Sequence, residues 1–253
     1  GRMRLFAIGG AKFDAEAERF LLESGFPYGI GYGLTETAPL IAGAVGNMVR
    51  IGSTGPSLPD VQIRLDDINP ETGQGEIVVK TPCCMKGYYK NEEATKMAFT
   101  KDGWFRTGDL GAIADDGWIY IKGRLKNMIV GASGENIYPE DIEEVLNSNR
   151  FVAESVVTEE DGKLIALVYF DTTALEEAYD EFKHKVAVNA EQLNLKMEEI
   201  KREVMEYVNS KVNRFSKITK VVDNEGEFEK TPTKKIRGFV YDRRNKSKDN
   251  EQK

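Results

Sequence analysis

Histidine and cysteine are scarce in this sequence. Its 253 residues include one histidine and two cysteines, and the two cysteines, Cys83 and Cys84, are adjacent. Structural zinc sites and serine–histidine triads depend on these residue types, so both have little support here. His184 lies between two lysines and is expected to be a solvated surface residue. A disulfide between neighbouring cysteines is strained, which favours free thiols in a reducing cytosol.

Long apolar runs and an excess of positive charge are also missing. No segment reaches the length of a membrane span, and no signal peptide begins the chain. The net charge of -7 gives no reason to expect nucleic acid or an anionic membrane as a general partner. Charged residues make up 30% and hydrophobic residues 40%, the balance of a globular protein with one large domain or two medium ones. We therefore expect a cytoplasmic protein without a transmembrane segment, for which a peripheral membrane contact is left open.

Residues 1–37 predict an α/β arrangement. A short buried strand at residues 4–8 is followed by a helical pattern and by a second short strand at residues 28–30. The polar loop at residues 31–37, GYGLTET, comes directly after it, where α/β sheets place ligand groups. It offers an aromatic face for a base, a hydroxyl for a phosphate oxygen and a carboxylate for magnesium. A capped helix start is the alternative interpretation of this loop.

The next part of the chain reads as sheet. Residues 61–65 and 75–80 alternate like half-buried strands, and residues 110–122 predict a hairpin around an Asp-Asp-Gly turn. Residues 52–55 superficially resemble a phosphate-cradling loop. However, no lysine follows the second glycine and no helical pattern comes after it. We expect a structural role for residues 52–55, 61–65, 75–80 and 85–99 and for the two cysteines.

Residues 103–144 concentrate the chemistry. The TGD sequence at residues 107–109 places a carboxylate on a glycine-bounded turn, and GRLK at residues 123–126 puts two cations beside a glycine. A glycine-rich loop follows at residues 131–134. Pro139 then begins a helix, as proline favours the first helical position.

Beyond Pro139 the pattern is that of a separate α+β unit. We expect a helix to residue 147, a hairpin of strands at 152–158 and 164–170, helices at about 175–190 and 196–212, and a strand at 218–222. The basic segment at residues 228–237 closes the ordered part, and a solvated tail is its alternative interpretation. From Arg243 onward the chain is expected to be frayed.

These motifs resemble those of the adenylate-forming superfamily of acyl-CoA synthetases, nonribosomal adenylation domains and beetle luciferases. TGD, GRLK and GENIYPEDIE (residues 134–143) resemble its seventh and eighth core motifs in order and spacing. YGLTET, the segment at residues 85–99 and TPTKKI resemble the fifth, sixth and tenth. The resemblance implies α/β plus α+β architecture. Residues 1–125 are then the end of a large domain, an α/β segment and a distorted β-barrel. Residues 126–253 are a small mobile domain with a helical insertion at 174–215.

The resemblance also implies a role for individual residues. Tyr32 stacks on adenine, Thr35 contacts a phosphate, and Glu36 helps to hold Mg²⁺. Asp109 binds the ribose hydroxyls, and Lys126 is the hinge between the domains. The nucleotide-binding set is Gly9, Gly10, Ala11, Tyr32, Gly33, Thr35, Asp109, Arg124 and Gly134, and the catalytic set is Lys235, Thr35 and Glu36.

Lys235 is assigned to the reacting carboxylate and the α-phosphate during adenylation. The family usually has glycine where this chain has Lys234, so Lys234 is the alternative for that role.

The implied reaction is that of an ATP-dependent acid–thiol ligase with two steps. A carboxylic acid and Mg-ATP give an acyl-adenylate and pyrophosphate, and coenzyme A then displaces AMP. GENIYPEDIEEVL, KTPTKKI and the helical insertion look most like long-chain fatty acid–CoA ligases. The alternatives are acyl-AMP ligases or amino-acid adenylation domains, which pass their product to a carrier protein. A nucleotide-binding module without turnover is an alternative of a different class.

Two features of the family are missing from the sequence. These are the loop that holds the β- and γ-phosphates and most of the acyl-binding pocket, both of which precede this segment in family members. The chain also begins almost at once in a strand-like run. We expect the C-terminal half of a ligase, with the N-terminal half of the same polypeptide as partner, and we expect this chain alone to make no acyl-CoA.

Overall fold

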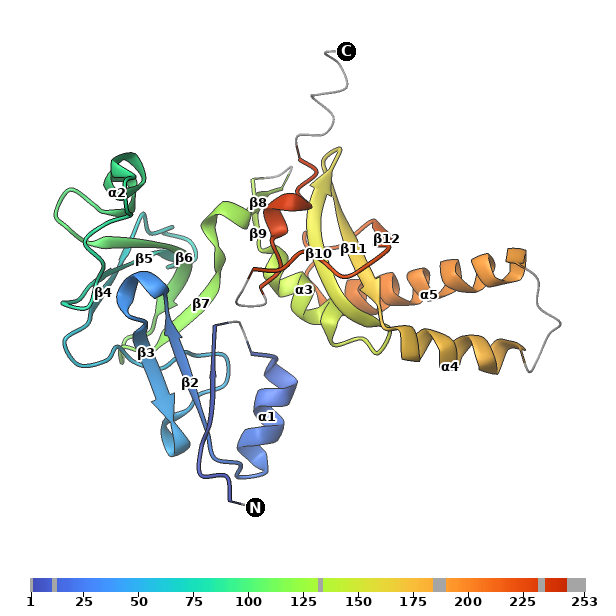
Figure 1. Cartoon of the computed structure of the whole chain (residues 1–253), viewed down its shortest axis with the longest axis horizontal. Helices are drawn as coiled ribbons and strands as arrows, with labels where there is room; N and C mark the ends of the chain where they lie inside the picture. Colours follow the sequence, from blue (N-terminus) through green and yellow to red (C-terminus); the bar gives the residue numbers. More distant parts are fainter. Residues whose placement is uncertain (1, 11–12, 132–133, 184–189, 232–234, 245–253) are drawn as a thin grey trace, which may run out of the picture. The chain divides into compact units, whose positions relative to one another are not determined.

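The chain forms two compact units, Gly1–Lys126 and Asn127–Lys253 (Figure 1). Each unit has its own hydrophobic core. The computed structural model describes residues 2–10, 13–131, 134–183, 190–231 and 235–244. Among these residues, no helix is both long enough and apolar enough to cross a membrane.

The first unit begins with a three-stranded sheet. Strand β1 (Phe6–Gly9) pairs in parallel with β2 (Tyr28–Gly33), which pairs antiparallel with β3 (Leu40–Val45). The parallel pair is joined by helix α1 (Ala15–Glu23), because parallel neighbours need a crossover connection. The Asp14 side chain caps this helix by accepting a hydrogen bond from the Ala17 amide at 2.7 Å.

The predicted burial of the first strand is wrong. Phe6 is 44% exposed, and most of β1 is exposed. In the described chain β1 is an edge strand, with β2 as its neighbour on one side.

The second sheet of this unit is antiparallel, with the order β4-β5-β6-β7. Its strands are β4 (Gln62–Asp66), β5 (Gly75–Lys80), β6 (Phe105–Ile113) and β7 (Ile119–Arg124). The hairpin predicted for residues 110–122 is confirmed as β6 and β7. The sheet is open, so the expected distorted barrel is present as four strands that do not close.

One core joins the two sheets of the first unit. Ile41 and Ala42 of β3 pack with Ile77, Val79, Phe105 and Ile119 of the second sheet. Short elements complete the unit: η1 (Thr35–Thr37), η2 (Gly46–Met48), α2 (Glu92–Ala98) and η3 (Leu125–Asn127).

The second unit is built on the sheet β10-β11-β12. A two-residue ladder of β8 (Ile129–Val130) and β9 (Asn136–Ile137) precedes α3 (Pro139–Asn147). Strands β10 (Val152–Glu160) and β11 (Lys163–Phe170) form the predicted hairpin. Asp161 and Gly162 both have positive φ, as its tight turn requires. Two helices then lead to β12 (Lys220–Asp223), which pairs in parallel with β11.

Helices α4 (Thr172–Lys183) and α5 (Ala190–Lys211) extend beyond the end of the sheet in Figure 1. The predicted stripe on α5 is confirmed at Ile200, Val204 and Val208, which are buried with α3 against one face of the sheet. Phe228 and Val156 belong to a smaller cluster on the other face. His184 lies outside the described residues.

The predicted fraying from Arg243 onward is wrong at its first residue. The Arg243 amide donates to Thr158 Oγ1 at 3.1 Å, and its guanidinium pairs with Glu160 at 3.0 Å. These contacts follow the short turn η4 (Gly238–Val240) and hold the segment on β10.

Candidate functional site

A buried carboxylate lies at the centre of the candidate site in the first unit. Asp109 is 4% exposed, and its Oδ2 accepts a hydrogen bond from Tyr32 Oη at 2.6 Å. Its Oδ1 lies 2.8 Å from Arg124 Nε, and the two residues are register partners on β6 and β7. Three residues that the motifs placed far apart in the sequence are thus in direct contact.

Burial and the charge of Asp109 together set the protonation of Tyr32. Burial, followed by the Asp109 carboxylate, raises the pKa of Tyr32. The Tyr32 hydroxyl therefore stays protonated and donates to the carboxylate at neutral pH. The arrangement is a fixed acceptor site flanked by one cation and one aromatic ring.

The TGD sequence was expected to be a turn, and this expectation is wrong. Residues 107–109 lie inside β6, which pairs with β5 on one side and β7 on the other. Gly108 has a φ of +68°, and the β5–β6 ladder shifts register between Glu76 and Val78. Such an irregularity changes where a strand aims its side chains. The glycine is needed within the strand, because a left-handed φ is costly for other residues.

Thr107 holds this irregular backbone in place. Its Oγ1 donates to the Ile77 carbonyl at 2.7 Å and accepts from the Asp109 amide at 3.1 Å. The Thr107 carbonyl in turn accepts from Arg124 Nη1 at 3.2 Å. Thr107 is 5% exposed, so these bonds satisfy a buried hydroxyl and fix the carboxylate beside it.

The glycines predicted for the nucleotide lie beside Tyr32. Gly9 is the register partner of Gly31, and a Cβ on Gly9 would come 3.1 Å from the Gly31 carbonyl oxygen. A Cβ on Gly33 would lie 1.7 Å from the Pro39 carbonyl oxygen, so no other residue fits there. Gly10 has a φ of +85°, with open space at its Cβ position. Ala11 lies outside the described residues.

Thr35 and Glu36 occupy the turn η1 directly after β2. The Glu36 carbonyl accepts from the Met85 amide at 2.7 Å, and its Oε1 accepts from Tyr88 Oη at 3.0 Å. Thr35 is exposed. No group of three or more His, Cys, Asp or Glu side chains in the described chain is arranged to hold a metal ion. Glu36 offers a single carboxylate, and proteins commonly bind Mg²⁺ through one or two carboxylates together with the phosphates of a nucleotide.

Tyr88 was missed by the sequence analysis, which expected only a structural role for its segment. A GYY sequence gives no signal of a contact with Glu36, 52 residues earlier. That contact depends on how the segment at residues 85–88 packs beside η1, which only the folded structure shows.

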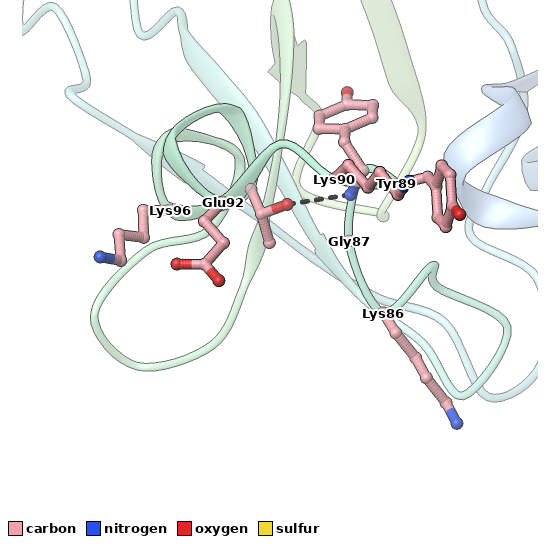
Figure 2. Close-up of a pocket in the computed structure, with 8 residues that line it drawn as sticks. Lys86, Gly87, Tyr89, Lys90, Glu92 and Lys96 are labelled. Atoms are coloured by element: carbon pink, nitrogen blue, oxygen red, sulfur yellow. Dashed lines mark hydrogen bonds between the residues drawn. The ribbon is translucent and has the colours of Figure 1, made fainter.

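The hollow beside Tyr88 is a separate feature. It has a volume of about 490 Å³ and is lined by residues 86–90 and by Glu92, Thr95 and Lys96 of α2. Figure 2 shows that Lys86 and Lys96 point away from each other. The dashed line in the figure is the hydrogen bond from the Tyr88 amide to Thr95 Oγ1, which joins two residues of the lining itself. Its charged side chains do not converge, and none of the predicted site residues lines it.

The remaining predicted residues lie outside this cluster. Lys126 is exposed in η3 and is the last residue of the first unit. Gly134 is exposed with a φ of +84° in the second unit, and Lys235 is exposed in the same unit. Lys234, the alternative to Lys235, lies outside the described residues.

Comparison with known proteins shows what the chain as a whole is similar to. Residues 1–89 match the family described as AMP-binding enzyme. The long-chain-fatty-acid–CoA ligase FadD15 of Mycobacterium bovis is 37% identical over 177 residues, 70% of this chain and 28% of that protein. The 2-succinylbenzoate–CoA ligase of Bacillus cytotoxicus is 37% identical over 160 residues, 61% of this chain and 33% of that protein. The chain therefore spans about a third or less of these curated relatives.

Solved structures give the fold. MenE, the o-succinylbenzoate CoA synthetase of Bacillus subtilis in complex with its acyl-adenylate OSB-AMP, aligns with a TM-score of 0.73 at 28% identity. The alignment covers 92% of this chain and 45% of that one. ATP-bound MatB of Rhodopseudomonas palustris aligns with a TM-score of 0.72 at 27% identity, over 96% of this chain and 46% of that one. The predicted fold class is confirmed, and the chain has the fold of adenylate-forming enzymes.

Proposed function

We propose that this chain, which matches the AMP-binding enzyme family over residues 1–89 and has the fold of adenylate-forming enzymes, is part of an ATP-dependent acid–CoA ligase. The observation that carries the proposal is the contact of Tyr32, Asp109 and Arg124 in one buried cluster. The proposed domain boundary is at residues 125–126, with Lys126 as the hinge. A cytoplasmic location stays a prediction.

In this proposal the cluster binds the nucleoside. A carboxylate has about four acceptor positions, so Asp109 can accept the ribose hydroxyls while it keeps its contacts with Tyr32 and Arg124. The Tyr32 ring supplies the apolar surface on which adenine stacks, beside the backbone of Gly9 and Gly33. Gly10, Ala11, Arg124 and Gly134 complete the proposed nucleotide-binding set.

The phosphates are assigned to polar groups that follow β2. The Thr35 hydroxyl contacts a phosphate oxygen, and the Glu36 carboxylate helps to hold Mg²⁺, which neutralises phosphate charge when it is bound. MenE and MatB structures have been solved with ATP, and one MenE structure also with a magnesium ion. These ligands are those that the proposal gives to this chain.

Lys235 supplies the positive charge for the first step. The acid attacks the α-phosphorus, an acyl–phosphate bond forms, and pyrophosphate leaves. The Lys235 ammonium neutralises charge on the carboxylate and α-phosphate oxygens. In the second step the thiol of coenzyme A attacks the acyl carbon and AMP leaves. Before this second step, the second unit rotates about Lys126 and exchanges the groups that face the nucleotide.

The acid is proposed to be a long-chain fatty acid. The supporting observations are the 37% identity to FadD15 over 70% of the chain and the helices between β11 and β12. The 2-succinylbenzoate ligases are as similar in identity, over a shorter part of the chain. Acyl-AMP ligases and amino-acid adenylation domains, which use a carrier protein as acceptor, are the alternatives within the same chemistry.

The test is ATP–pyrophosphate exchange with a panel of acids, measured on the protein that contains this chain together with the preceding half of a ligase. Exchange with fatty acids, followed by thioester formation with coenzyme A, is the expected result. Exchange with 2-succinylbenzoate or an amino acid instead would show that the substrate is not a fatty acid. Product found only on a carrier protein would show that the acceptor is not coenzyme A. Nucleotide binding without exchange for any acid would support the alternative of a nucleotide-binding module without turnover. The 253-residue chain alone is expected to give no acyl-CoA.

A further inference from the structure

Backbone contacts join the described residues on either side of residues 232–234. Lys230 and Ile236 form an isolated β-bridge, and the Thr231 amide donates to the Lys235 carbonyl at 2.8 Å. The Lys235 amide donates to Thr231 Oγ1 at 3.2 Å. The backbone at Lys235 is therefore set by the two residues on the opposite side of the bridge.

Lys230 attaches these bridged residues to the sheet. Its ammonium pairs with Glu154 of β10 and lies 3.1 Å from Glu227 Oε2. The Lys230 side chain is 29% exposed and that of Glu154 is 21% exposed, so this pair is only partly screened by water. Glu154 Oε2 also accepts from the Phe228 amide at 3.4 Å, which ties the same segment to β10 a second time.

An aromatic pair covers the base of the loop. Phe228 is 2% exposed, and its ring meets Tyr241 edge to face with centroids 4.7 Å apart. Tyr241 Oη accepts from the Glu229 amide at 2.8 Å, and Ile236 packs on the same apolar cluster. The base is held by ionic, polar and apolar contacts, while Lys235 itself is exposed.

We propose that Lys230 is a positioning residue for Lys235, holding the base of the loop on β10 through Glu154 so that the Lys235 ammonium is presented in one place. This inference rests on the proposed function, in which Lys235 serves adenylation. Lys230 is not itself the catalytic cation, because two carboxylates already neutralise it. The hydrogen bond to Glu154, followed by that to Glu227, raises the pKa of Lys230, which keeps this anchor charged.

The experiment separates the two half-reactions in the longer ligase. Lys230→Gln should slow acyl-adenylate formation between about 10-fold and 100-fold, the scale on which misplaced catalytic groups act. The KM for ATP should change by less than about twofold, and thioester formation from preformed acyl-adenylate should be unchanged. Lys230→Arg should restore most of the rate, and Glu154→Gln should act like Lys230→Gln without adding to it.

A matched control and a structural readout make the test specific. Lys201→Gln removes a lysine that pairs with Glu198 on α5, and it should change neither half-reaction. In the 253-residue chain, Lys230→Gln should accelerate amide hydrogen exchange at the described residues of 228–237 and leave α3 and α5 protected.

Three results would overturn the inference. These are normal adenylation in Lys230→Gln, equal slowing of both half-reactions, or faster exchange throughout the second unit. If the parent protein makes no acyl-adenylate even with its natural sequence, the proposed function fails instead, and the exchange pattern alone then decides whether Lys230 holds the loop.

Discussion

The two units present their functional groups in opposite ways. In the first unit, Asp109 is 4% exposed and is held by contacts from β2 and β7. In the second unit, Lys235 is exposed, and the described residues next to it are held on the sheet through Lys230 and Glu154. Tyr32 and Asp109, which are proposed to bind the nucleoside, thus lie in strands, whereas the lysine that is proposed for one chemical step lies outside the strands. This difference is what a ligase needs if the same nucleotide stays bound while the reactive lysine is exchanged.

The largest effect is expected from removing the loop lysine. Lys235→Ala should slow acyl-adenylate formation in the longer ligase by about a hundredfold or more, on the order of 3 kcal/mol, because a preorganised charge is lost from the transition state. Conversion of preformed acyl-adenylate to thioester should proceed at close to the normal rate. Single-turnover measurements time both steps. An adenylation defect in Lys234→Ala instead would reassign the role to that lysine.

The opposite half-reaction should respond to the proposed hinge. Lys126→Pro fixes φ at the residue where the backbone is proposed to turn, so thioester formation should fall at least tenfold while adenylation is spared. The same single-turnover assays measure this. Limited proteolysis of the chain should also cut between residues 123 and 135. Cleavage confined to the segment after Arg243 would argue against a mobile boundary there.

The independence of the two cores can be tested by a cavity in one of them. Ile200 is 1% exposed in the core of the second unit, and Ile200→Ala should destabilise that unit by about 3 kcal/mol. Thermal unfolding followed by calorimetry should show one transition shifted and the other unchanged. If both transitions shift together, the units are energetically coupled and the comparison between them must be revised.

The buried cluster of the first unit should depend on one hydroxyl. Tyr32→Phe keeps the aromatic ring and removes the donor to Asp109, a hydrogen bond to a charged group that contributes about 1.5 kcal/mol. AMP binding, measured by calorimetry on the longer protein, should weaken by about tenfold. Tyr89→Phe, at a side chain that is 88% exposed, is the control. If Tyr32→Phe and the natural protein bind AMP with equal affinity, the Tyr32 hydroxyl does not contribute to nucleotide binding.

A further expected effect is a pH dependence confined to the second unit. Burial, followed by the Glu140 charge, raises the pKa of Glu143 to about 7, against the hydrogen bond that its carboxylate accepts from the Val157 amide. The unfolded state loses this proton at a lower pH than the folded state. Stability should therefore fall as the pH rises from about 4.5 to 7. At about 1.4 kcal/mol per pKa unit, the loss attributable to Glu143 is on the order of 3 kcal/mol.

Urea unfolding at several pH values checks this dependence. Glu143→Gln retains an acceptor for the Val157 amide. It should remove the fall in the free energy of unfolding that the natural chain shows between about pH 4.5 and 7. A profile that is unchanged by Glu143→Gln would assign the pH dependence to other groups.

The resemblance to adenylate-forming enzymes could be predicted from the sequence because core motifs are short and their order is preserved. Hairpins such as β10–β11 were also predictable. Their turns need positive φ at Asp161 and Gly162, and such local backbone requirements select particular residues. The buried stripe on α5 could be predicted from the spacing of its apolar residues. Ile200, Val204 and Val208 are four residues apart, and this spacing places them on one face of an α-helix.

Contacts between distant residues were decided only by the tertiary structure. The motifs gave roles to Tyr32 and Asp109, but the bond between them joins positions 77 residues apart. The bond depends on how β2 packs beside β6. TGD was mistaken for a turn because a glycine signals a break locally, whereas pairing on both sides keeps residues 107–109 in a strand. The Lys230–Glu154 pair likewise joins a loop to a distant strand, since folding, not spacing, brings those charges together.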